Sequence, residues 1–145
     1  METTARNQPV IVARTYSAPV EKVWRALTDN EQMKQWFFKL PEFKAEPGFE
    51  FEFEAGKDEK KFMHKCVVKE VIPNQRLSYS WRYEGYEGNS LVSFDLSEDD
   101  GGTRVTITHT GLETFPNVED FAPENFNGGW SYFLNDALAG FLDKQ

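Results

Sequence analysis

His64 and Cys66 carry side chains suited to metal binding or nucleophilic chemistry, and they lie two residues apart. Residues two apart on a strand point to the same face, so an imidazole and a thiol, both zinc ligands, would lie together there. The chain has no second cysteine, its other histidine is His109, and no carboxylate is obviously placed with these residues. We therefore predict no metal site, because a lone inward histidine is usually a hydrogen-bonded residue of a core or cavity.

Motifs for catalysis or cofactor binding are not found in the sequence. It contains neither a Gly-x-Ser-x-Gly nucleophile elbow nor a glycine-rich motif for phosphate or dinucleotide binding. Glu50, Glu52 and Glu54 are close in sequence, but their alternation with phenylalanines places them on the solvent face of a strand. We predict no catalytic residue and no cofactor. A cofactor-free enzyme that depends on His109 is the least favoured of three functional hypotheses.

Aromatic residues make up 15% of the chain, and they favour the binding of an apolar molecule. Small-molecule sites are usually apolar pockets with a few polar anchors, and several of these aromatic side chains have a polar tip. The alternative is that the same rings form a filled hydrophobic core. We call the residues predicted to line a ligand site the predicted ligand set: Trp36, Phe51, Phe53, Tyr79, Trp81, Phe94, His109, Trp130 and Phe133.

The sequence patterns predict the elements that position this set. Alternating β-branched residues predict a strand over residues 10–16, and apolar residues at helical spacing predict a helix within residues 17–29 and a short one over residues 31–37. From residue 43 onward, alternation predicts antiparallel strands with one apolar and one polar face. Residues 1–9 are predicted to be a flexible tail, and residues 10–145 a single α+β domain.

Residues 125–142 predict a long C-terminal helix whose apolar stripe covers the sheet. Gly128, Gly129 and Gly140 interrupt it, although each costs about 1 kcal/mol relative to alanine within a helix. We interpret Gly129 as part of the stripe, where a missing side chain lets the helix approach the sheet or leaves open volume. Replacing Gly129 by leucine is then expected to destabilise the fold or close the space.

Charge and composition exclude several classes of protein. The net charge of −8 disfavours nucleic-acid binding, which needs clustered lysines and arginines. The single cysteine excludes an internal disulfide, and neither a signal-peptide core nor an apolar run of about 18 residues occurs. We expect a cytoplasmic monomer without a membrane span.

The chain resembles the START-like (SRPBCC, Bet v 1-like) superfamily, and within it the family of proteins similar to the C-terminal domain of the activator of heat-shock-protein-90 ATPase. The similar stretches are "APVEKVWRALTDNEQMKQWF", "PGFEFEF", "VVKEVIPNQRLSYSW", "GTRVTITHTGL" and "GGWSYFLNDALAGFL". The resemblance implies a helix-grip fold, in which a curved antiparallel sheet of six or seven strands wraps around the C-terminal helix. Two short helices follow the first strand.

The resemblance also implies a function. Many relatives bind a hydrophobic small molecule in a cavity between sheet and helix, where His109 would be a polar anchor. We therefore expect a lipid-, polyketide- or aromatic-like ligand. The alternative is a stress-response or chaperone-modulating module that acts through its exposed sheet, although the eukaryotic co-chaperones use a further N-terminal domain for much of that contact.

Overall fold

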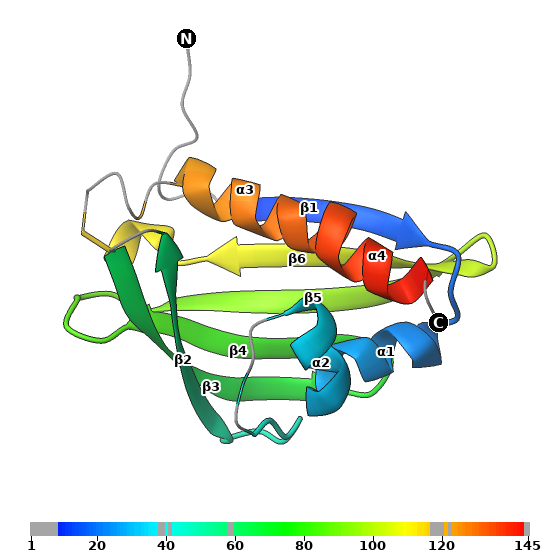
Figure 1. Cartoon of the computed structure of the whole chain (residues 1–145), viewed down its shortest axis with the longest axis horizontal. Coiled ribbons are helices and arrows are strands. Elements are labelled where there is room, and N and C mark those ends of the chain that lie inside the picture. Colours follow the sequence, from blue (N-terminus) through cyan, green and yellow to red (C-terminus); the bar gives the residue numbers. More distant parts are fainter. Residues whose placement is uncertain are drawn as a thin grey trace, which may run out of the picture.

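The computed structural model describes residues 9–37, 40, 42–57, 60–116, 121 and 123–143, so nearly all of the predicted N-terminal tail lies outside the described residues. Figure 1 shows an antiparallel sheet with helices on one side. The elements in chain order are β1 (Val10–Tyr16), α1 (Val20–Thr28), α2 (Asn30–Trp36), β2 (Glu50–Lys57), β3 (Lys60–Ile72), β4 (Arg76–Tyr83), β5 (Ser90–Asp99), β6 (Gly102–Thr110), the short helix η1 (Leu112–Thr114), α3 (Pro123–Tyr132), the π-helical turn η3 (Phe133–Ala137) and α4 (Leu138–Asp143).

The sheet has six strands in the order β1-β6-β5-β4-β3-β2, and every neighbouring pair is antiparallel. Alternation buries one face: Val105, Ile107 and His109 of β6 are buried, whereas Arg104 and Thr110 are exposed. The register changes between Val68 and Glu70 on β3, a bulge of the kind that bends a strand. The α+β helix-grip fold expected from the resemblance is confirmed, with six strands rather than seven.

The helices α1 and α2 lie together at one end of the sheet (Figure 1). The Asp29 side chain accepts a hydrogen bond from the backbone N–H of Glu31 at 3.1 Å and so caps α2. The Trp36 indole Nε1–H donates to the Ala26 carbonyl oxygen at 2.8 Å. This bond between the two helices fixes the Trp36 ring toward the interior.

The C-terminal helix runs continuously through α3, η3 and α4, and it lies along β1 in Figure 1. Its buried side chains include one at every fourth residue, Phe126, Trp130, Leu134, Leu138 and Leu142, with Ala139 buried beside them. In a regular α-helix, four residues turn by about 400°, so such a stripe would drift around the helix by about 40° per step. The wider π turn in the middle reduces this drift and keeps both ends of the stripe on the sheet side.

β1 contacts the π turn directly. The Tyr16 hydroxyl donates to the Leu134 carbonyl oxygen at 2.6 Å, and Arg14 Nη1 lies 3.3 Å from both the backbone and side-chain oxygens of Asn135. Carbonyl groups of a π turn lose regular α-helical partners, so side-chain donors of this kind satisfy them. The first strand therefore fixes the middle of the C-terminal helix.

The interpretation of Gly129 is wrong. Gly129 is exposed, as is Gly128, and a Cβ atom built at either position or at Gly140 would meet nothing within 4 Å. None of the three glycines brings the helix close to the sheet or opens space beneath it. Gly102 is different, because a Cβ atom there would overlap the carbonyl oxygen of Tyr16. One close approach of backbones that needs glycine is therefore between β6 and the end of β1, and another is at Gly88, where a Cβ atom would meet the Thr114 carbonyl oxygen at 2.5 Å.

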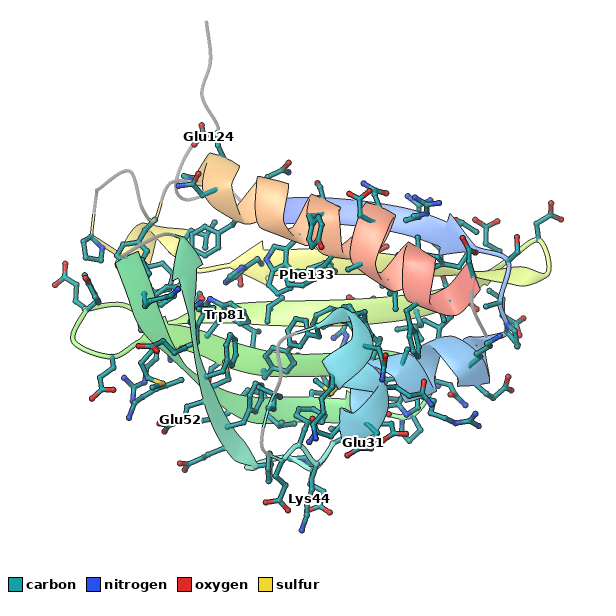
Figure 2. The ribbon with its side chains drawn as sticks, viewed as in Figure 1. Glu31, Lys44, Glu52, Trp81, Glu124 and Phe133 are labelled. Atoms are coloured by element: carbon teal, nitrogen blue, oxygen red, sulfur yellow. The ribbon has the colours of Figure 1, made fainter. Side chains whose placement is uncertain are left out.

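Charged side chains surround this core. Figure 2 shows Glu31, Lys44, Glu52 and Glu124 at the periphery of the molecule, whereas Trp81 and Phe133 lie toward its centre. Among the described residues, no helix is both long and apolar enough to cross a bilayer.

Candidate functional site

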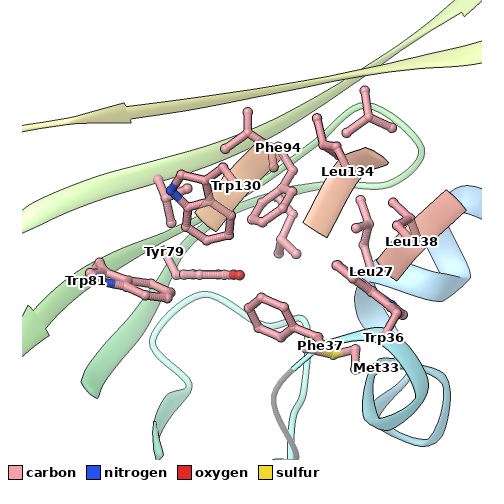
Figure 3. Packing of buried hydrophobic residues seen from close by; sticks show 14 of the residues in the cluster. Leu27, Met33, Trp36, Phe37, Tyr79, Trp81, Phe94, Trp130, Leu134 and Leu138 are labelled. Carbon is pink, nitrogen blue, oxygen red and sulfur yellow. The ribbon is translucent and has the colours of Figure 1, made fainter. Parts of the chain in front are cut away.

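The predicted ligand set converges between the buried face of the sheet and the C-terminal helix. On one side, the set comes from helix α2 and from the four strands β2, β4, β5 and β6. On the other side, it comes from α3 and η3 of the C-terminal helix. Every member is buried except Phe133, which is half-buried. Figure 3 shows several of these side chains facing one another across the interior.

Ring contacts join the set into one cluster. The Trp81 and Trp130 ring centroids are 5.3 Å apart, and those of Phe94 and Trp130 are 5.8 Å apart, which connects sheet and helix. On the opposite side of the cluster, the ring centroids of Trp36 and Phe133 are 6.1 Å apart. These distances are typical of favourable edge-on and tilted aromatic pairs. The set is thus a single three-dimensional group, as the sequence predicts, although its role in binding stays a prediction.

On the strand side, Phe51 and Phe53 of β2 stack at a centroid distance of 6.4 Å. Phe51 also contacts the Tyr79 ring at 5.1 Å, and Phe53 contacts Trp81 at 5.7 Å. Phe37 joins the cluster from the end of α2, with its ring 5.2 Å from that of Phe133. Phe37 is not in the predicted ligand set, yet it lies among its members.

His109 is the centre of a closed chain of hydrogen bonds. The Trp130 Nε1–H donates to His109 Nδ1 at 3.1 Å, and His109 Nε2 lies 2.7 Å from the Ser90 hydroxyl oxygen. The Ser90 hydroxyl in turn donates to the Trp81 carbonyl oxygen at 2.7 Å. Because Trp130 is a donor and the Ser90 proton is already used, the neutral tautomer with a proton on Nε2 satisfies every member.

Burial lowers the pKa of His109 to about 3. A second proton, on Nδ1, would also face the Trp130 N–H, so the hydrogen-bond geometry favours the same neutral form. Both ring nitrogens are bonded to protein groups. The expected role of His109 as a polar anchor would therefore require a ligand to replace Trp130 or Ser90.

His64 and Cys66 are both buried on β3, and each has a shifted pKa. Burial lowers the pKa of His64 to about 4 and raises that of the Cys66 thiol. The His64 ring stacks on Phe53 at 4.5 Å, and the Trp81 ring lies between it and His109 at centroid distances of 5.1 Å and 5.9 Å. Within the described part of the chain, no three histidine, cysteine or acidic residues are grouped as metal ligands.

Tyr79 differs from the other polar-tipped residues of the set. The Trp81 Nε1–H donates to the Tyr83 hydroxyl at 2.9 Å, so both of those groups are paired. The Tyr79 side chain is only 1% exposed, and its hydroxyl takes part in none of the hydrogen bonds found among the described residues; the one fully buried side-chain atom without a partner there is Asn30 Oδ1. Burial raises the pKa of Tyr79 well above its usual value, so the hydroxyl keeps its proton.

Sequence reasoning missed a second aromatic cluster beside the first. Phe121 lies among four rings, with centroid distances of 4.9 Å to Tyr83 and 5.5 Å to Phe115. Phe126 connects the two clusters, since its ring contacts Phe115 at 6.1 Å and His109 at 5.0 Å. Phe115 directly follows the short helix η1 and Phe121 has a 3-10 conformation, so neither belongs to an apolar pattern long enough to predict which way its side chain points.

Known proteins share the sequence family and the fold of this chain. Residues 17–143 match the family described as Activator of Hsp90 ATPase homolog 1-like protein. The chain is similar in structure to protein MLL2253 from Mesorhizobium loti, with a TM-score of 0.80 and 30% identity over 95% of this chain and 98% of that one. Among curated proteins, none matches the chain significantly.

Two further solved structures are similar to this chain. DynU16, described as a protein in the dynemicin biosynthetic locus, has a TM-score of 0.77 and 25% identity over 94% of this chain, which spans 47% of DynU16. CalU16 from Micromonospora echinospora has a TM-score of 0.68 and 27% identity, covering 94% of this chain and 74% of that one.

Proposed function

The chain belongs to the Activator of Hsp90 ATPase homolog 1-like family, and from this premise we propose that it binds a hydrophobic small molecule between its sheet and its C-terminal helix. The observation that carries the proposal is the convergence of the predicted ligand set in one buried aromatic cluster with contributions from both sides. Apolar walls with a few polar groups are typical of small-molecule sites.

The relatives support a small molecule as the ligand. DynU16 is described as a protein in the dynemicin biosynthetic locus, and a role with a small molecule is in keeping with that description. The lining rings favour a lipid-, polyketide- or aromatic-like compound, because flat apolar ligands stack well on tryptophan and phenylalanine. His109 is a weak candidate for a catalytic base, because with a pKa of about 3 it would not take a proton effectively at neutral pH. Binding therefore has more support than catalysis.

Titration of the purified protein tests the proposal. Flavonoid, polyketide and fatty-acyl compounds would be added while indole N–H resonances are followed by NMR. Trp36, Trp81 and Trp130 lie in the cluster, whereas Trp24 is half-buried on α1 and makes no ring contact with it. We expect a ligand to shift the three cluster resonances more than that of Trp24.

A pair of variants of neighbouring residues provides the control. Phe133 contacts Trp36 and Phe37, whereas Tyr132 is 57% exposed. Phe133→Ala should weaken binding at least severalfold, and Tyr132→Ala should leave it within twofold of the wild type. The proposal is wrong if no compound class shifts Trp81 or Trp130 more than Trp24.

The family description favours one alternative, modulation of an Hsp90-type chaperone. In that case the exposed face of the sheet, with Arg104 and Thr110, is the contact surface. Mixing the protein with such a chaperone should then change its ATPase rate. An unchanged rate at high protein concentration would count against this alternative and would leave the small-molecule proposal intact.

A further inference from the structure

The Tyr79 hydroxyl is the starting point, because the comparable polar groups around it already have partners. The indoles of Trp36, Trp81 and Trp130 all donate hydrogen bonds within the protein. The hydroxyl of Tyr16 does so as well, to the carbonyl oxygen of Leu134. Buried polar groups are nearly always paired, so a buried hydroxyl without a bond to any described residue needs an explanation.

The surroundings of this hydroxyl are apolar. The Tyr79 ring contacts Phe51 at 5.1 Å and Phe94 at 5.7 Å, and in the view of Figure 3 its oxygen points away from Trp81 into the space between Phe37 and Phe94. Trp130 of the C-terminal helix lies over the same region, 5.8 Å from Phe94. The hydroxyl is therefore directed into the middle of the predicted ligand set rather than toward solvent.

Among the described residues, no charged side chain is buried in this interior. The buried polar residues of the described chain are histidines, serines and a threonine, with no lysine, arginine, aspartate or glutamate among them. Both buried histidines are neutral at physiological pH, because burial lowers the pKa of each. A carboxylate ligand would lose its hydration there without gaining a cationic partner, which is strongly unfavourable.

Resting on the proposed function, we propose that the ligand is a neutral, largely apolar molecule with an oxygen acceptor such as a ketone, and that Tyr79 donates its hydroxyl proton to that oxygen. The contact would give a partner to the Tyr79 hydroxyl, which has none among the described residues. This assignment favours aromatic or polyketide-like ketones over free fatty acids within the ligand classes of the proposed function.

Three probes of similar size test the assignment: 2-acetylnaphthalene, its hydrocarbon analogue 2-isopropenylnaphthalene, and 2-naphthoate. Binding of each to the wild type and to Tyr79→Phe would be measured by calorimetry at neutral pH. We expect Tyr79→Phe to weaken the ketone about tenfold and to leave the hydrocarbon within twofold, because only the ketone loses a hydrogen bond. Naphthoate should bind the wild type at least tenfold more weakly than the ketone.

A measurement on the wild type alone keeps the test decisive should Tyr79→Phe fold poorly. The ring carbon bonded to the Tyr79 hydroxyl should shift in the NMR spectrum with the ketone and not with the hydrocarbon. The inference is overturned if ketone and hydrocarbon bind but neither the variant nor this resonance distinguishes them, an outcome that leaves the proposed function standing. Failure of all three probes and of the wider compound panel overturns the proposed function itself.

Discussion

Two polar regions face the C-terminal helix from the same sheet, and they are organised in opposite ways. Around His109, every donor and acceptor is used in a chain from Trp130 through Ser90 to the Trp81 carbonyl. Around Tyr79, aromatic rings pack on the phenol, but its hydroxyl has no bond to a described residue. Both side chains are essentially inaccessible to solvent, at 0% and 1% exposure.

The difference distinguishes a group that stabilises the fold from one that is available to a ligand. A satisfied buried network contributes to stability and specifies one arrangement of the side chains, whereas an unpaired hydroxyl lowers stability. From the sequence, His109 is the expected polar anchor. The geometry gives more support to Tyr79 for that role, because its hydroxyl can bind a ligand without breaking an existing bond.

The largest expected effect is that of His109→Ala. The substitution removes the acceptor of Trp130 and the donor to Ser90 and leaves a cavity, so we expect unfolding free energy to fall by about 3 kcal/mol. Urea denaturation measures this loss. Thr110→Ala, at the exposed neighbouring position, is the control and should change stability by less than about 0.5 kcal/mol. Equal losses for both variants would contradict a structural role for the His109 network.

Acidification should lower the free energy of unfolding through the two buried histidines. The pKa values of His109, about 3, and His64, about 4, lie below that of an unfolded histidine, so the unfolded chain binds protons that the folded chain does not. The contribution is fully present above about pH 6.5 and is lost as the pH falls toward these values, by up to about 1.4 kcal/mol per pH unit for each histidine.

Urea titrations between pH 7 and pH 4.5 measure this dependence. His109→Gln should make the unfolding free energy depend less steeply on pH, because one of the two buried histidines no longer contributes. Tyr79→Phe should keep the wild-type dependence on pH, since Tyr79 does not titrate in this range. A slope that His109→Gln leaves unchanged would show that His109 does not stay neutral in the folded protein.

One substitution at two tyrosines sharpens the contrast further. Tyr16→Phe deletes the bond to the Leu134 carbonyl and the buried donor that makes it, so we expect a loss of about 1.5 kcal/mol. Tyr79→Phe deletes no bond to a described residue, so stability should stay within about 0.5 kcal/mol of the wild type or rise. Thermal and urea unfolding of both variants measure the difference, and a larger loss for Tyr79→Phe would refute the comparison.

The smallest expected effect is a gain on the outer side of the C-terminal helix. Gly129→Ala should stabilise the protein by about 0.5–1 kcal/mol, because the new Cβ meets open space and alanine is the better helix former. Ligand affinity should not change, since this side lies away from both polar regions. Gly102→Ala is the opposing control and should destabilise, because its Cβ would overlap the Tyr16 carbonyl oxygen. A loss of stability in Gly129→Ala would restore the interpretation that this glycine faces the sheet.

The elements of the fold could be predicted because their patterns are periodic. Residues 10–16 match β1, and the alternation of Phe51 and Phe53 with glutamates matches the buried and exposed faces of β2. The convergence of the predicted ligand set follows from these faces and from the family resemblance. Periodicity predicts which face of a strand or helix a residue occupies. This is enough to predict that the members of the predicted ligand set lie together.

Partners within the interior could not be predicted, since they depend on which side chains meet. Nothing in the sequence near His109 indicates that Ser90 and Trp130 occupy both of its nitrogens. The misplacement of Gly129 does not come from the π turn, because Gly129 lies before that turn in α3, where each residue turns the helix by about 100°. Gly129 is therefore on the exposed side of its buried neighbour Trp130. Phe121 has a 3-10 conformation and is not part of a long apolar pattern, so the sequence does not predict its ring contacts.

The π turn makes the C-terminal helix adjustable by length. Deleting one residue between Phe133 and Ala137 would rotate α4 by about 100° relative to α3 and move Leu138 and Leu142 off the sheet, while Phe126 and Trp130 stayed in place. Insertions and deletions in this turn therefore change the packing of Leu138 and Leu142 near α2. They leave the packing of Phe126 and Trp130 around His109 unchanged. Within this fold, the shape of a binding site can vary through helix phase alone, with every lining residue retained.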